Sequence, residues 1–157
     1  MKIYEKRWSQ MVHGELEEVW KFFSRPENLE KITPDDMKFE IVTNVREIEM
    51  YPGILIRYKV SPFPRFKIEW TTEITAVKDC TYFIDEQRFG PFKLWHHQHH
   101  FESVEGGVLM QDILHYAIPF GILGRLMNKW SISRRIERIF EYRKSVIADF
   151  FPDRRKS

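Results

Sequence analysis

Residues 84–116, IDEQRFGPFKLWHHQHHFESVEGGVLMQDILHY, decide the fold, because they are predicted to form most of three consecutive antiparallel strands. Gly90-Pro91 and Glu105-Gly106-Gly107 interrupt the stretch, and such residues set the backbone where a strand turns back. The predicted strands cover residues 80–89, 92–103 and 108–116. Five of the six histidines of the chain lie in this stretch, so it is the first place to look for a functional site.

A tight turn that places Val104 opposite Gly107 would set the register of the last two strands. His99 then lies opposite Asp112, and His97 shares the same face because side chains alternate along a strand. Aromatic residues at both ends of this face indicate that it is buried; they are Trp95, Phe101 and Tyr116. The histidines between them, His96 and His100, are predicted to be solvated on the opposite face.

The inner polar set is predicted to comprise Asp85, Gln87, His97, His99 and Asp112. Asp85 and Gln87 join it if the preceding turn has even parity, which the pattern leaves open. An H-x-H pair beside a carboxylate can hold a metal ion. A buried hydrogen-bonded network, in which Asp112 fixes the tautomer of His99, is favoured over that alternative, and no metal is predicted. A catalytic role for His97 or His99 as general acid or base also stays open.

The chain has 157 residues, and its 25 basic and 23 acidic side chains give a formal net charge of +2. A domain of that size buries about 70% of its unfolded surface. Residues 1–151 are therefore predicted to form a single domain, followed by a basic tail at 152–157. The balanced charge provides no extended field for nucleic acid, so no nucleic-acid partner is expected.

Cys80 is the only cysteine, which excludes an intrachain disulfide framework and a CxxC site. No apolar run approaches the roughly 20 residues of a membrane span, and no apolar signal sequence opens the chain. We therefore expect no stable membrane insertion and predict a cytoplasmic protein.

Hydrophobic periodicity places an amphipathic helix after the first strand and a long helix at the end of the chain. Pro26 begins a second short helix. The remaining segments alternate or are bounded by turn residues, as strands are. The predicted order is strand 2–12, helices 16–23 and 26–32, strands 38–50, 54–60 and 66–76, the three strands above, and helix 122–150. An α+β fold follows, with a curved antiparallel sheet of about seven strands wrapped around the C-terminal helix.

The long C-terminal helix has two apolar faces that one straight helix cannot bury together. Phe140 lies in the main apolar sector, which also contains Arg143, a charge that must find a partner or a ligand. Leu123, Met127 and Trp130 lie on the other side. Either the chain bends near residues 131–133, or the first part is a separate element that forms a lid, a homodimer contact or a membrane contact.

Four motifs resemble the SRPBCC or START-like superfamily, in particular its bacterial polyketide cyclase/dehydrase-like branch. They are E-x-V-W-x-F-F-x-x-P-x-N-L at 17–29, D-x-Q-x-x-G-P-F-x-x-W-x-H-x-H-x-F at 85–101, D-x-x-x-Y-x-x-P at 112–119, and Tyr142-Arg143. The resemblance covers nearly the whole chain and implies a helix-grip fold with a cavity between the sheet and the last helix. The iron site of the oxygenase subgroup is not evident, and no cofactor is predicted.

The resemblance implies that a small, largely apolar molecule, such as a lipid, aromatic or polyketide-like compound, is carried or sensed in this cavity. A cyclase or dehydratase that uses His97 or His99 is the alternative, and a structural or partner-binding domain is the third possibility. The predicted ligand-binding residues are Tyr58, Trp70, Asp85, Gln87, Trp95, His97, His99, Phe101, Asp112, Tyr116, Phe140 and Arg143.

Overall fold

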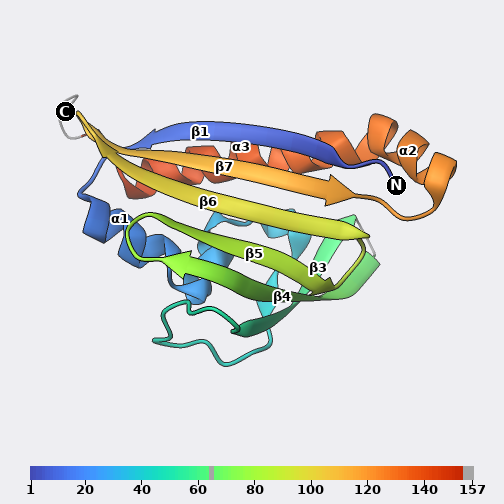
Figure 1. The fold of residues 1–157 in the computed structure, drawn as a ribbon, viewed down its shortest axis with the longest axis horizontal. Coiled ribbons are helices and arrows are strands. Elements are labelled where there is room, and N and C mark those ends of the chain that lie inside the picture. Colours follow the sequence, from blue (N-terminus) through green and yellow to red (C-terminus); the bar gives the residue numbers. More distant parts are fainter. Residues whose placement is uncertain (64–65, 154–157) are drawn as a thin grey trace.

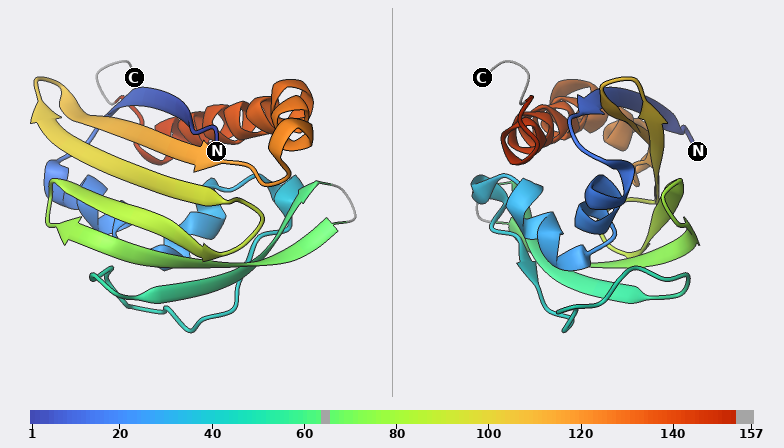
Figure 2. Two further views of the ribbon diagram at one scale, coloured as in Figure 1. Left: turned by 45° about the vertical axis from the view of Figure 1, so that its right-hand side comes forward. Right: turned by 90° about the vertical axis from the view of Figure 1, so that its left-hand side faces the viewer.

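The computed structural model describes residues 1–63 and 66–153. Seven strands are present in this part of the chain: β1 Tyr4–Val12, β2 Glu40–Ile41, β3 Leu55–Phe63, β4 Phe66–Lys78, β5 Tyr82–Phe89, β6 Leu94–Val104 and β7 Gly107–Ala117. They form one antiparallel sheet in the order β1-β7-β6-β5-β4-β3-β2. The sheet curves around the long helix α3, Ser133–Phe150 (Figures 1 and 2). The predicted α+β architecture is confirmed.

Helices cover the concave face of the sheet. The helix α1, Leu16–Phe23, follows β1 and buries Val19, Trp20 and Phe23 at helical spacing. Two 3-10 helices come next, η1 at Pro26–Ile32 and η2 at Asp35–Met37. Both lie beneath the sheet on the same side as α3 (Figure 2), so the sheet and helices enclose the interior between them.

The predicted register of β6 and β7 is confirmed, with Val104 opposite Gly107 and His99 opposite Asp112. Gly107 is required at the turn for two reasons. Its φ is +149°, and a Cβ there would lie 2.3 Å from the carbonyl oxygen of Val12 on the neighbouring strand β1. The turn therefore depends on the absence of a side chain at this position.

Replacing Gly107 with alanine is expected to lower the free energy of unfolding by about 2–3 kcal/mol, because backbone strain and a backbone clash act together. Chemical denaturation measures the change. Gly53→Ala is the control, since Gly53 also has positive φ, +96°, but nothing within 4 Å of its added Cβ. The control should lose about 1 kcal/mol, and equal losses in the two variants would contradict the role of the Val12 contact.

The strand predicted at 38–50 is mostly wrong. Only Glu40–Ile41 pairs with β3, and the chain then forms a loop. Val45 packs with Ile54, Ile56 and Ile74 in a small apolar cluster. The amide of Met50 donates to the carbonyl oxygen of Ser24 at the end of α1. The loop is thus held by its own core and by α1, which the alternation of bulky residues could not distinguish from a strand.

The strand predicted at 54–60 is longer than expected, because β3 continues to Phe63 and pairs with Phe66. The pairing register shifts between Val60 and Phe63. A β-bulge of this kind lets a strand contain a residue that lacks an amide donor, here Pro62.

The C-terminal helix changes its winding close to residues 131–133, where a bend was one of the two alternatives. The helix α2, Gly121–Met127, leads into a π-helical segment, η3, at Asn128–Ile132, and then into α3. The buried Asn128 accepts a hydrogen bond from Tyr116 of β7 at 3.0 Å. One extra residue per turn rotates the apolar face of α2 away from that of α3.

The residues of the second apolar face are exposed, with Leu123 at 61%, Met127 at 43% and Trp130 at 72%. A bent helix that buries them is therefore wrong, whereas the homodimer contact stays a prediction. In the described part of the chain, no helix has the length and apolar character needed to cross a membrane. Arg154, Arg155 and Lys156 of the predicted basic tail lie outside the described residues.

Candidate functional site

Four polar side chains from three neighbouring strands meet on the concave face of the sheet. Asp85 of β5 lies opposite His97 of β6, and His99 of β6 lies opposite Asp112 of β7. The turn between β5 and β6 thus has the parity that places Asp85 on the inner face. The sequence had left this parity open. Both histidines are buried. We call these four residues the inner quartet.

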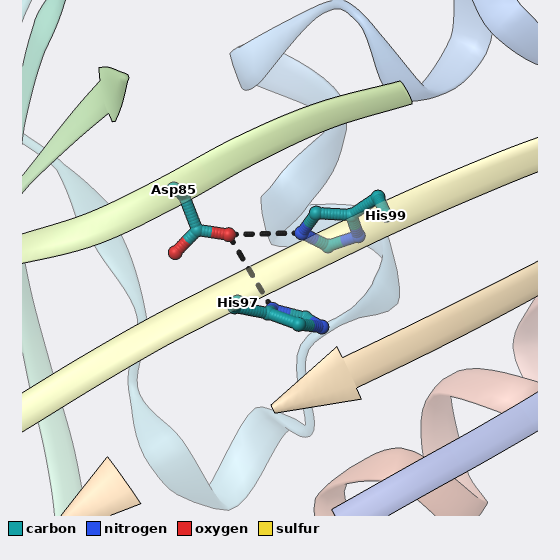
Figure 3. Close-up of side chains that lie close together, drawn as sticks. All are labelled: Asp85, His97 and His99. Atoms are coloured by element: carbon teal, nitrogen blue, oxygen red, sulfur yellow. Dashed lines mark hydrogen bonds and ion pairs between the residues drawn. The ribbon is translucent and has the colours of Figure 1, made fainter. Parts of the chain in front are cut away.

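Each imidazole of the inner quartet lies between the two carboxylates. His97 places Nε2 at 2.9 Å from Oδ1 of Asp112 and Nδ1 at 3.4 Å from Oδ2 of Asp85. His99 places Nε2 at 2.8 Å from Oδ2 of Asp85 and Nδ1 at 3.0 Å from Oδ1 of Asp112. Figure 3 shows the shared oxygen of Asp85 facing both rings. The predicted link between His99 and Asp112 is present, and Asp85 and His97 complete a closed ring of contacts.

The carboxylates of the inner quartet are held ionised. Burial acts to raise the pKa of Asp112, but the charge of Arg143 and hydrogen bonds from His97 and His99 outweigh it, so this pKa lies well below its usual value. Burial acts in the same direction on Asp85, yet hydrogen bonds from the same two histidines keep its pKa below the usual value. The cluster therefore contains two negative charges, one of them on the buried Asp112.

The pKa values of the two histidines are shifted in opposite directions. Burial acts to lower the pKa of His97, but its hydrogen bonds to Asp112 and Asp85 raise the pKa overall. Burial and the positive charge of His97 lower the pKa of His99. His97 is therefore the more readily protonated of the two rings.

Arg143 is buried in the apolar sector of α3, and the structure supplies the partners that the sequence required. Its Nη2 lies 3.4 Å from Nδ1 of His99, and its guanidinium lies over the rings of Phe23 and Phe140 at 5.8 and 5.9 Å. Its Nε has no hydrogen-bond partner among the described residues. This free donor makes Arg143 incomplete without a further acceptor.

A cavity of about 250 Å³ lies beside the inner quartet, between the sheet, α3 and the short helices η1 and η2. Most of its wall is apolar, and the aromatic side chains of Trp70, Phe92 and Trp95 contact one another along it. Asp85, His97 and His99 provide a charged region of the wall. The cavity thus combines apolar surface with a few converging polar groups, which is the usual composition of a small-molecule site.

No protein-family model matches this sequence. No curated protein matches it either. Solved structures do match. TTHA0849 of Thermus thermophilus superposes with a TM-score of 0.68 and 16% identity over 93% of this chain and 98% of its own. The di-domain ARO/CYC StfQ of the steffimycin biosynthetic pathway superposes with a TM-score of 0.73 and 10% identity. The match covers 99% of this chain and 52% of StfQ.

A norcoclaurine synthase of Thalictrum gives a TM-score of 0.65 and 10% identity over 95% of this chain and 96% of its own. This chain has the helix-grip fold, which it shares with these structures. The low identities establish the fold alone, and this chain spans about half of StfQ. A fold does not determine function, which depends on the residues that this helix-grip fold brings together.

The helix-grip cavity contacts eight of the twelve predicted ligand-binding residues. They are the aromatic residues Tyr58, Trp70, Trp95 and Phe140, and the polar residues Asp85, His97, His99 and Arg143. Tyr58 shares a hydrogen bond of 2.6 Å with Thr72, and burial raises the pKa of its hydroxyl. These eight residues place parts of the sheet and of α3 on the cavity wall.

The other four predicted residues do not line the cavity. Gln87 donates to the carbonyl oxygen of Phe92 at 2.7 Å and accepts from its amide at 3.2 Å, so it holds the turn between β5 and β6. Phe101 packs in the core against Trp20 and Phe23. Tyr116 bonds to Asn128. Asp112 contacts the histidines from behind the cavity wall.

One wall of the helix-grip cavity was missed in the sequence. Arg25, Asn28, Leu29 and Ile32 line it from the end of α1 and from η1, and Met37 does so from η2. The short helix at 26–32 was predicted, but periodicity alone does not show which element it will face. The apolar residues of that helix were the available indication.

Proposed function

We propose that this protein binds a small, largely apolar molecule in the helix-grip cavity, as a carrier or a sensor. The observation that supports this most strongly is the cavity itself, an apolar space of about 250 Å³ with charged groups on one part of its wall. Ligand pockets commonly measure about 300–1,000 Å³, so the ligand is a compact compound.

Unpartnered donors on the cavity wall indicate which polar groups the ligand has. The indole Nε1 of Trp70 and the Nε atoms of Arg25 and Arg143 are buried, and no hydrogen-bond partner for them lies in the described residues. All three are donors, so they fit acceptor oxygens rather than donor groups. An aromatic or polyketide-like compound with carbonyl, phenolate or carboxylate oxygens meets this requirement.

Ile139→Trp is expected to weaken binding of the fluorescent apolar anion 1-anilinonaphthalene-8-sulfonate by about tenfold or more, because the larger side chain fills the cavity. Ile139 lines the cavity from α3 and is only half-buried, so the fold can accommodate the change. Fluorescence titration gives the affinity, and circular dichroism checks the fold.

Ile113→Trp is the matched control. Ile113 pairs with Gln98 on the opposite face of the sheet and does not line the cavity. The Ile113→Trp variant should bind the probe with the affinity of the wild type. Binding that Ile139→Trp leaves unchanged would show that the probe occupies another surface. Native mass spectrometry of the purified wild-type protein then identifies any ligand that co-purifies.

A cyclase or dehydratase is the second candidate, and one observation favours it. His97 and His99 reach the cavity wall, where the carbonyl groups of a bound compound would lie. If His97→Gln or His99→Gln abolishes turnover of a bound polyketide while its affinity is preserved, the enzyme is supported. Loss of stability alone supports a structural network.

A further inference from the structure

We propose that Asp85, His97 and His99 form a binding site for a divalent first-row transition metal ion such as Zn²⁺, with Asp112 orienting both histidines. One donor atom from each of the three ligands lies within 4.8 Å of the other two. The proposal concerns the metal alone and does not depend on the binding of an apolar ligand.

The three proposed ligands already point at one place. Oδ2 of Asp85 lies 2.8 Å from Nε2 of His99 and 3.4 Å from Nδ1 of His97 (Figure 3). Zinc binds nitrogen and carboxylate oxygen at about 2.0–2.2 Å, so ligand atoms at neighbouring corners of a tetrahedron or octahedron lie about 3.0–3.5 Å apart. The observed separations match this spacing to within a small shift of the side chains.

The remaining ring nitrogens are held as metal-binding histidines usually are. A ligating histidine generally donates its other N–H to a carboxylate, which sets its tautomer and orientation. Here Oδ1 of Asp112 lies 2.9 Å from Nε2 of His97 and 3.0 Å from Nδ1 of His99. One carboxylate oxygen therefore serves both rings and directs their other nitrogens toward Asp85.

A metal ion also accounts for all four contacts in the inner quartet. Without a cation, four close contacts between nitrogen and oxygen need four N–H groups, which the rings supply only if both are charged. With a cation, two neutral rings bind the metal through Nδ1 of His97 and Nε2 of His99, and they direct the N–H groups at Nε2 of His97 and Nδ1 of His99 to Asp112. The 3.4 Å approach of Nη2 of Arg143 to Nδ1 of His99 is then a contact between two donors and not a hydrogen bond. The two contacts to Asp112 each join a donor to an acceptor, and the two contacts to Asp85 are separations between ligands of one ion.

The donor set indicates the class of metal. Two imidazoles and one carboxylate suit zinc, iron, nickel or copper, whereas magnesium and calcium prefer oxygen ligands alone. Three protein ligands leave at least one coordination position open, as in catalytic zinc sites. The three ligands line the cavity and Asp112 does not, so the open position faces the cavity and can take water or an oxygen of a bound compound.

The outer histidines lack this arrangement and supply matched controls on the same strand. His96 contacts Glu86 at 2.8 Å, and His100 contacts the side-chain oxygen of Gln98 at 3.0 Å. Both are half-buried on the opposite face of β6. Among the described residues, three metal-binding groups converge at Asp85, His97 and His99, and no such set contains His96 or His100.

The test is calorimetric titration of chelator-treated protein with Zn²⁺, together with the visible absorption of the Co²⁺ complex. The wild type is expected to bind one equivalent of each ion. Asp112→Asn should weaken Zn²⁺ binding by about 10–100-fold, and Asp85→Asn, His97→Gln and His99→Gln should weaken it by larger factors. His96→Gln and His100→Gln should bind as the wild type does.

Two results would overturn the proposal. One is a wild-type protein that binds no stoichiometric Zn²⁺ and gives no Co²⁺ absorption bands. This measurement uses the wild type alone, so it does not depend on the folding of any variant. The other is binding that His96→Gln or His100→Gln weakens as much as His97→Gln, which would place the ion on the outer face. Circular dichroism of each variant identifies loss of fold, and Asp112→Asn, which keeps the side-chain shape, supplies a second measurement if a ligand variant unfolds.

Discussion

Replacing Asp112 with alanine is expected to lower the free energy of unfolding of the metal-free protein by about 3–5 kcal/mol, which is the usual cost of removing one partner from a buried charged pair. Asp112 is buried, accepts hydrogen bonds from His97 and His99, and lies in the field of Arg143. Its removal leaves their donors and the charge of Arg143 without this partner. Urea denaturation after treatment with a chelator measures the change.

Two further variants test whether the loss comes from charge. Gln111→Ala, at the exposed neighbouring position of β7, should change stability by no more than about 0.5 kcal/mol. Asp112→Ala combined with Arg143→Met should lose less than the sum of the two single variants, by about 1–3 kcal/mol, because it removes both opposite charges. Strict additivity would show that Asp112 and Arg143 do not stabilise each other.

Phe140→Ala is expected to lower the free energy of unfolding by about 3–5 kcal/mol, the usual range for truncating a buried aromatic side chain. The ring of Phe140 is buried and stacks on Trp8 of β1 with a centroid distance of 3.7 Å. It also lies 5.3 Å from the ring of His97. The substitution therefore removes packing between α3 and the sheet and enlarges the cavity. Thermal and chemical denaturation both measure the effect.

Trp130→Ala is the control for Phe140→Ala, because it also truncates an aromatic residue of the C-terminal helical region but at a side chain that is 72% exposed. Its expected change is within about 0.5 kcal/mol. A large loss of stability in Trp130→Ala would mean that the exposed apolar face is covered in solution, and a dependence on protein concentration would then identify the homodimer contact. A small loss in Phe140→Ala would contradict the packing of α3 described above.

The inner pair of histidines could be predicted because strand alternation is a local property. Once Gly107 sets the turn, the two-residue period places His97 and His99 on the face of Asp112 and removes His96 and His100 from it. The apolar sector of α3 could also be predicted, since a period of 3.6 residues marks the buried face and shows that Arg143 lies within it. These features need no knowledge of what the segment packs against.

The 38–50 loop and the position of Gln87 could not be predicted in the same way. Residues 42–50 contain enough bulky side chains for a strand, but Val45 packs with Ile74 of β4 and the amide of Met50 donates to the backbone of Ser24. Strand alternation places Gln87 on the inner face, yet its side-chain amide forms hydrogen bonds with the backbone of Phe92 in the turn. Both depend on which groups come close in the folded chain.

The sequence by itself determined the antiparallel sheet with its long C-terminal helix, the register of β6 and β7, and the division of the histidines between two faces, because these follow from local periodicity and turn chemistry. Tertiary structure decided that Asp85 and Asp112 each contact both inner histidines, that η1 and η2 form a wall of the cavity, and that Trp130 is exposed. The physical reason is that a side chain's face is set by its own strand or helix, whereas its partners are set by elements distant in sequence. The proposed metal site belongs to the second kind, since its ligands come from two strands and their orientation from a third.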